Sequence, residues 1–213
     1  MDISNYIEHT ILKADTSSSD IKQKCNEAKK YKFYGVCVPP FFVKVAVDEL
    51  KDFKTKVVTV VGFPLGYTST LSKIQEAKEA IQMGASEIDM VINIAALKDK
   101  QYSSVLEDVK SVCEFVHSKK SILKVIIETA LLNLEEKVKA IDICKEANVD
   151  FVKTSTGFSE SGAKIEDIVL MRKNLPKKIR IKASGGIKTK EQAIALIKSG
   201  ADRLGTSSSI ELL

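Results

Sequence analysis

The chain has 213 residues, of which 44% are hydrophobic and 29% are charged, and its formal net charge is +5. This composition is typical of a globular protein with one sizeable core, and it excludes a disordered chain. No apolar run approaches the ~20 residues that a membrane-spanning helix needs, and the lysines are spread along helix faces rather than gathered into a nucleic-acid surface.

Eight short apolar segments, each bounded by turn residues, are predicted as strands. In chain order they cover 7–11, 35–38, 56–62, 87–92, 123–128, 151–155, 180–184 and 203–206.

Segments with apolar residues at helical spacing lie between these strands and are predicted as helices. The clearest cover 19–31, 70–83, 102–118, 134–147, 164–174 and 189–199. Three of them are followed by Gly84, Asn148 and Gly200, which fit the left-handed conformation that closes a helix. The alternation predicts an α/β protein, a (β/α)8 TIM barrel formed by one domain over 1–213. A doubly wound open sheet is the alternative.

Lysines recur at intervals of 29 residues as Lys124 in L-K-V-I-I-E, Lys153 in F-V-K-T-S-T-G and Lys182 in I-K-A-S-G-G. That interval fits one strand, one helix and two loops, so three consecutive strands are expected to carry a lysine at matching height. Burial removes hydration from an ammonium group and a second ammonium repels it, so both effects lower a lysine's pKa. Such a lysine can attack carbonyl groups.

Period-two alternation directs Glu87, Asp89 and the three lysines into the barrel interior. Apolar side chains normally fill that space, so charges there form either a structural ion network or a reaction centre. The structural interpretation is strongest for Lys124. It is weaker for Lys153 and Lys182, which we expect at the carboxyl ends of strands, where barrel enzymes place catalytic groups.

Two glycine-containing segments, S-G-G-I-K-T and R-L-G-T-S-S, accompany the seventh and eighth predicted strands. Backbone amides near glycines and helix N-termini bind anions, and the loops after these strands are the usual phosphate position in a barrel. Either segment alone is as often a tight turn, but together they predict a phosphate site.

Eight motifs, in order, resemble the 2-deoxyribose-5-phosphate aldolase family, and the likeness runs from about Tyr6 to Ser208. They are E-H-T-I-L-K, G-V-C-V-P-P, V-V-G-F-P-L-G, E-I-D-M-V-I-N, L-K-V-I-I-E-T, F-V-K-T-S-T-G-F, I-K-A-S-G-G-I-K-T and R-L-G-T-S-S. The resemblance implies a class I aldolase that works without metal or cofactor. Its expected reaction is the reversible cleavage of 2-deoxy-D-ribose 5-phosphate to acetaldehyde and D-glyceraldehyde 3-phosphate, in deoxyribonucleotide catabolism.

The resemblance also implies roles for individual residues. Lys153 would form the Schiff base, the ammonium of Lys182 would lower the pKa of that nucleophile, and Asp89 would relay protons through water. The residues implied around the substrate phosphate are Gly157, Ser184, Gly185, Gly186, Lys188, Gly205, Ser207 and Ser208.

Two features depart from the family pattern. Phe158 stands where some members have a lysine after the S-T-G turn, so that phosphate contact is missing and Lys188 gains weight. Some members end in a tail with a terminal tyrosine that takes part in proton transfer, whereas this chain ends in I-E-L-L. Proton transfer is therefore expected to depend on Asp89, Lys182 and water.

Two alternative functions stay open: another phosphosugar aldolase or isomerase on the same barrel, or a non-catalytic metabolite-binding barrel. The expected partners are small phosphosugar and aldehyde substrates, with no nucleic acid, membrane or metal, and a homodimer is left open. The N-terminus lacks a secretion signal and the four cysteines form no C-x-x-C pair. These features predict a cytoplasmic protein.

Overall fold

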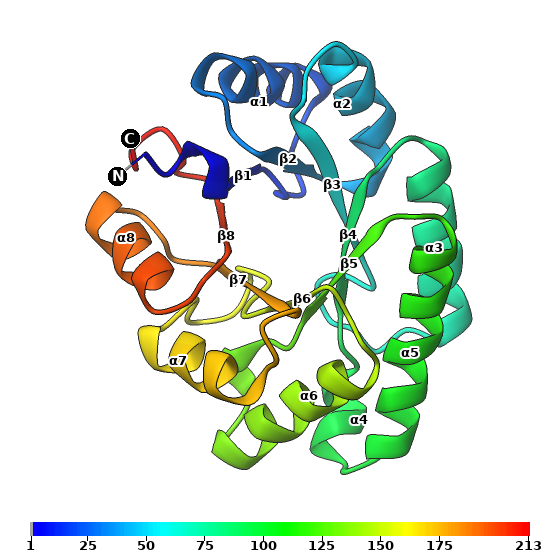
Figure 1. Ribbon diagram of the computed structural model, residues 1–213. Helices are drawn as coiled ribbons and strands as arrows, with labels where there is room; N and C mark the ends of the chain where they lie inside the picture. Colours follow the sequence, from blue (N-terminus) through cyan, green and yellow to red (C-terminus); the bar gives the residue numbers. More distant parts are fainter. Residues whose placement is uncertain (1) are drawn as a thin grey trace.

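A closed barrel of eight parallel strands forms the centre of the computed structural model, which describes residues 2–213 (Figure 1). The strands are β1 (Ile7–Thr10), β2 (Gly35–Val38), β3 (Lys56–Val61), β4 (Glu87–Val91), β5 (Ile122–Ile126), β6 (Phe151–Lys153), β7 (Arg180–Ser184) and β8 (Arg203–Thr206). Each strand pairs with its sequence neighbours, and β1 pairs with β8. The predicted (β/α)8 barrel is therefore confirmed, and the alternative of an open sheet is wrong.

Eight α-helices surround the strands (Figure 1). They are α1 (Ser18–Tyr31), α2 (Val43–Leu50), α3 (Thr70–Gln82), α4 (Ile94–Lys98), α5 (Tyr102–Ser118), α6 (Leu134–Glu146), α7 (Ile165–Asn174) and α8 (Lys190–Lys198). Short 3₁₀ turns at Ser4–Tyr6, Pro40–Phe42 and Thr129–Leu131 complete the connections. Two helices, α4 and α5, follow β4, and no helix follows β8 within the described part of the chain. None of these helices has the length and apolar character needed to cross a bilayer.

Local sequence signals fix where several helices begin and end. Asn133 and Thr189 close capping boxes at the starts of α6 and α8, which satisfies backbone N–H groups that the helix itself leaves free. At the opposite ends Gly84, Asn148 and Gly200 have φ angles of 105°, 55° and 116°, as the left-handed closing position requires. The chain can then turn at once into β4, β6 and β8.

Two kinds of core lie on the two sides of the sheet. Between strands and helices, a continuous apolar layer includes Ile88, Val125 and Ile181, all fully buried. Inside the barrel the apolar cluster is small, with Cys37, Val58 and Val60 as its buried members. Much of the remaining interior is charged, which is unusual because barrel interiors are normally filled by branched apolar side chains.

Glycines on the two neighbouring strands flank one of these charged residues. Glu8 of β1 is in register with Gly35 of β2 on one side and with Gly205 of β8 on the other. A Cβ atom on Gly35 would lie 3.6 Å from Glu8 Cγ. A full-sized side chain at Gly35 would therefore compete with Glu8 for the interior.

Candidate active site

Three lysines from neighbouring strands enter the barrel interior, as their 29-residue interval predicts. Lys153 of β6 lies beside Lys182 of β7 in the register of the sheet, so these two side chains start at the same height. Lys124 of β5 pairs with Phe151 instead, two residues before Lys153. The expectation of matching height is wrong for Lys124, because closing a barrel requires a stagger between strands that a sequence interval does not show.

Lys153 and Lys182 differ in how close they lie to the carboxyl ends of their strands. Lys153 is the last residue of β6, as expected, whereas β7 continues past Lys182 to Ser184. Lys182 therefore lies deeper in the barrel than the predicted carboxyl end of its strand.

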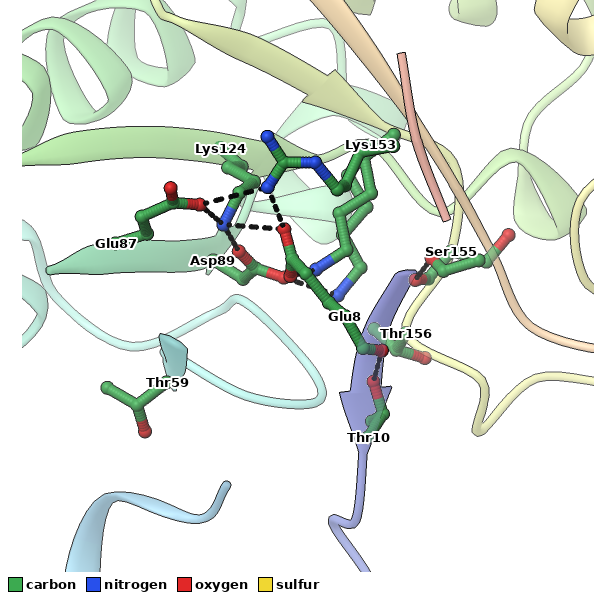
Figure 2. Close-up of polar contacts among 12 residues, drawn as sticks. Glu8, Thr10, Thr59, Glu87, Asp89, Lys124, Lys153, Ser155 and Thr156 are labelled. Atoms are coloured by element: carbon green, nitrogen blue, oxygen red, sulfur yellow. Dashed lines mark hydrogen bonds and ion pairs between the residues drawn. The ribbon is translucent and has the colours of Figure 1, made fainter. Parts of the chain in front are cut away.

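Asp89 of β4 binds all three lysines (Figure 2). Its Oδ2 accepts hydrogen bonds from Lys153 Nζ at 2.7 Å and from Lys182 Nζ at 2.6 Å, and its Oδ1 accepts one from Lys124 Nζ at 2.8 Å. Burial alone would raise the pKa of Asp89, but the three lysines outweigh it and hold the pKa well below its usual value. Asp89 is thus a carboxylate that joins two amines through a single oxygen.

Glu8 and Glu87 belong to the same buried charged cluster as Asp89 (Figure 2). Glu8 accepts hydrogen bonds from Lys182 and, at 3.0 Å, from Arg203 Nη1 of β8. Glu87 lies 2.7 Å from Lys124 Nζ and 3.6 Å from Arg203 Nη1. The guanidinium of Arg203 lies 3.3 Å from the centre of the Tyr34 ring, whose hydroxyl donates to Glu87.

The buried ion network, as we name this cluster, has four basic and three acidic members. They are Lys124, Lys153, Lys182, Arg203, Glu8, Glu87 and Asp89. All are buried, with Lys153 the most exposed of the lysines at 3%. Full ionisation would leave one uncompensated positive charge in a medium that penalises it strongly.

The lysines respond differently to this excess of positive charge. Burial lowers the pKa of Lys182, but Asp89 and Glu8 more than offset that effect and raise the pKa above its ordinary value. Lys124 is raised in the same way by Asp89, Glu8 and Glu87. For Lys153, burial and the nearby Lys182 outweigh Asp89, so its pKa is lowered. One amine of the network therefore deprotonates most easily, and it is Lys153.

A cavity of about 710 Å³ opens above the network at the carboxyl ends of the strands. Of the seven network residues, Lys153 is the one that lines it, while Lys182 and Asp89 lie beneath. The cavity also brings together all eight residues that the resemblance assigned to phosphate: Gly157, Ser184, Gly185, Gly186, Lys188, Gly205, Ser207 and Ser208.

These eight residues differ in what they offer to a ligand. Gly157, Gly185 and Gly186 have φ angles of 89°, 83° and 72°, the left-handed region that favours glycine. Ser208 already donates its amide to Thr206 Oγ1 at 3.0 Å, so its hydroxyl is the group left to meet a ligand. A Cβ on Gly205 would lie 3.0 Å from Lys182 Cε, so this glycine also makes room for the Lys182 side chain.

Two members of the buried ion network, Glu8 and Arg203, were not predicted from the sequence. Glu8 had a detectable signal, because alternation in I-E-H-T points Glu8 and His9 to opposite faces of β1. His9 does face outward and contacts Glu27 of α1 at 2.6 Å. Arg203 is the first residue of β8, where a basic side chain is easily taken for a solvent-facing strand end. Within residues 2–213, no group of three or more His, Cys, Asp or Glu is placed to hold a metal ion.

Comparison with known proteins identifies similar chains over the full length. Residues 4–207 match the model of the family described as DeoC/LacD family aldolase. A deoxyribose-phosphate aldolase from Caldicellulosiruptor saccharolyticus is 53% identical over 213 residues, which cover 100% of this chain and 97% of the relative. The deoxyribose-phosphate aldolase of Clostridium botulinum strain Langeland is 53% identical, and the alignment covers both chains completely. The tetrameric deoxyribose phosphate aldolase structure from Aeropyrum pernix superposes with a TM-score of 0.92 at 27% identity, over 99% of this chain and 88% of that one.

The role of Glu8 in compensating buried charge gives a stability prediction. We expect Glu8→Gln to lower the free energy of unfolding by about 3 kcal/mol, because it leaves Lys182 and Arg203 with too little negative charge. Urea denaturation followed by circular dichroism measures the change. The matched control is Glu107→Gln on the exposed face of α5, for which we expect a change within about 0.5 kcal/mol. Equal stability of the two variants would contradict a network that is short of negative charge.

Proposed function

Because the chain belongs to the DeoC/LacD family of aldolases, we propose that it cleaves 2-deoxy-D-ribose 5-phosphate reversibly through a Schiff base on Lys153. The products are acetaldehyde and D-glyceraldehyde 3-phosphate. As a member of this family the protein is a lyase. The observation that carries the residue assignment is that Lys153, the amine with the lowered pKa, is also the one that lines the cavity.

The reaction begins when the neutral amine of Lys153 attacks the aldehyde carbon of the open-chain sugar. Loss of water gives an iminium ion, which withdraws electrons from the neighbouring carbon–carbon bond. The hydroxyl on the third carbon loses its proton, the bond between the second and third carbons breaks, and its electron pair forms an enamine on Lys153. D-Glyceraldehyde 3-phosphate leaves, the enamine gains a proton at the second carbon, and water releases acetaldehyde.

Two network residues joined to Lys153 by hydrogen bonds, Asp89 directly and Lys182 through Asp89, support the proton transfers. Lys182 keeps its proton because Asp89 and Glu8 raise its pKa despite burial. It can therefore act as a general acid that donates a proton to the enamine. Asp89 remains ionised and bonds both amines through one oxygen, so it is placed to accept and return a proton, directly or through water. Lys124 contacts three carboxylates and does not line the cavity, which supports a structural role.

The phosphate end of the substrate is proposed to bind at the far end of the same cavity. Gly157, Gly185 and Gly186 offer backbone amides there, α8 begins nearby with its positive end, and Ser207 and Ser208 offer hydroxyls. Phe158 packs edge-to-face against Phe63, with 5.3 Å between the ring centres. As a phenylalanine it offers the phosphate no positive charge. Lys188, exposed and without an ion-pair partner among residues 2–213, is the cation proposed to approach the phosphate.

The wider setting follows from this reaction. The partners are small phosphosugar and aldehyde substrates, and the cytoplasm is the proposed location because phosphorylated sugars are made and consumed there. We also propose that 1–213 is one aldolase domain and that it works as a homodimer. Support for self-association comes from the relative of Aeropyrum pernix, whose structure is described as tetrameric.

Trapping the Schiff base tests the proposed function. With acetaldehyde and sodium borohydride we expect irreversible labelling of the wild type at Lys153, located by peptide mass spectrometry, and loss of activity in proportion. Lys153→Met is expected to lose both labelling and turnover. Turnover of a phosphosugar without any adduct would contradict the proposal and favour an isomerase. Labelling at another lysine would contradict the assignment of Lys153.

Removing Lys182 tests the cause of the lowered pKa of Lys153. Lys182 lowers that pKa, so Lys182→Met should raise it and leave less neutral amine at any given pH. We expect the pH dependence of borohydride labelling to move to higher pH, because the repulsion from the Lys182 ammonium is gone. The matched control is Lys73→Met, which removes another fully buried lysine, bonded to Asp108 outside the barrel interior. A pH profile unchanged in both variants would remove Lys182 from this role.

The Asp89→Asn variant tests proton relay separately from nucleophile protonation. Asp89 raises the pKa of Lys153, so its removal should leave Lys153 at least as deprotonated as before. We therefore expect kcat to fall about 10²-fold or more while KM changes little, because the loss is in proton transfer. Asp108→Asn, which removes a buried carboxylate paired with Lys73, is the control for general destabilisation. Unchanged kcat in Asp89→Asn would exclude Asp89 from the mechanism.

A further inference from the structure

The loop after β6 crosses the loop after β7 in direct backbone contact. We name residues 156–163 the strap, because they run from the end of β6 over the S-G-G segment toward α7. Three glycines meet where the loops cross. A Cβ on Gly185 would lie 3.0 Å from Gly162 Cα and 3.5 Å from Gly157 Cα. The two loops thus approach more closely than side chains would permit.

Gly162 is the residue on which this close approach depends most. A Cβ atom there would lie 1.9 Å from the carbonyl oxygen of Gly185 and 2.7 Å from its Cα. Its φ angle lies outside the left-handed region, so other residues could adopt its backbone conformation. Glycine is therefore required at 162 for space against Gly185, not for an unusual backbone angle.

Hydrogen bonds hold the strap at both ends. At its carboxyl end, the amide of Ala163 donates to the carbonyl oxygens of Ser184 and Gly185, at 3.0 Å each. At its amino end, the buried carboxylate of Glu128 accepts hydrogen bonds from the amide and the hydroxyl of Thr156. The Thr156 hydroxyl in turn accepts from the amide of Phe158 at 3.1 Å. These contacts involve only the protein, so they set the shape of the strap without any ligand.

Residues of the strap and of the S-G-G segment line the cavity where the phosphate is proposed to bind. Gly157 belongs to the strap, and Gly185 and Gly186 belong to the segment beneath it. Amide groups bind an anion well only when their relative positions are fixed beforehand. Phe158 brings no positive charge to the strap. Phosphate binding by the strap and the S-G-G segment therefore depends on where their backbone amides lie.

We propose that Gly162 is a positioning residue for phosphate recognition: it seats the strap on Gly185 and so fixes the spacing between the Gly157 amide and the amides of Gly185 and Gly186. This inference rests on the proposed function, since it concerns the phosphate of the proposed substrate. Gly162 does not itself contact the substrate. It acts through the position of Gly185.

The test compares a phosphorylated with an unphosphorylated substrate in Gly162→Ala. The new methyl group must push the two loops apart by about an ångström, so we expect KM for 2-deoxyribose 5-phosphate to rise on the order of 10- to 100-fold. The kcat/KM for 2-deoxyribose, which has no phosphate, should stay within about threefold of the wild type. Gly84→Ala is the matched control, because it strains a left-handed glycine at the end of α3, far from the cavity lining. It should leave the ratio between the two substrates unchanged.

A binding measurement separates this inference from the aldolase reaction. Glycerol 3-phosphate carries a phosphate but no carbonyl group. Calorimetry with this probe therefore measures phosphate binding whether or not Lys153 forms a Schiff base. We expect Gly162→Ala to weaken its binding on the order of 10-fold or more. If wild-type Lys153 were not labelled by acetaldehyde and borohydride, the proposed function would fail while this result could still hold.

A second variant covers the case in which Gly162→Ala does not fold. Thr156→Val keeps the side-chain shape but removes the hydroxyl that joins Glu128 to the Phe158 amide. It should show the same selective loss for the phosphorylated substrate. Equal losses for both substrates, or no loss of glycerol 3-phosphate binding in a folded variant, would overturn the proposal.

Discussion

Charge balance inside the barrel is the constraint on which the site depends. Four basic side chains meet three carboxyl groups where solvent is excluded, and Arg203 cannot give up its proton. Carboxylates compensate Lys124 and Lys182 well, since each contacts at least two of them. Lys153 contacts one carboxylate oxygen and shares it with Lys182. If Lys153 is neutral, the network has three positive and three negative charges. The neutral form that the proposed nucleophilic attack requires is therefore also the form that burial favours.

The fold provides this balance through register and small residues. Lys153 and Lys182 lie side by side on paired strands, and both donate hydrogen bonds to Asp89. Gly35 and Gly205 flank Glu8 in the sheet, and Gly35 leaves space for Glu8 while Gly205 leaves space for the Lys182 side chain that Glu8 contacts. Above the network, glycines again allow the backbone to come close, this time to bring amides around the cavity. The buried ion network and the proposed phosphate end of the cavity thus meet at Lys153, which belongs to the network and lines the cavity.

Much of this could be predicted from sequence, because strands and helices leave local signals. The predicted bounds of β2, β7, β8 and α5 agree with the structure, and the 29-residue interval identified the lysine-bearing strands. The prediction omitted α2 and α4, which are only eight and five residues long, although the buried residues Val43, Ala46 and Leu50 of α2 do have helical spacing. The relative height of Lys124 was wrong, because barrel stagger is a property of the closed sheet. Glu8 and Arg203 were missed because β1 and β8 meet only when the barrel closes, and the contact of Gly162 with Gly185 leaves no sequence pattern beyond a glycine.

The central claim is that Lys153 is the neutral member of the buried ion network. Its most direct test is an NMR titration of lysines labelled with ¹³C at Cε, with the Lys153 signal assigned by comparison with Lys153→Met. The account predicts that Lys153 deprotonates below the ordinary lysine pKa of about 10.4, while Lys124 and Lys182 stay protonated above it. A Lys153 signal that remains that of an ammonium up to the same pH as the surface lysines would contradict the account.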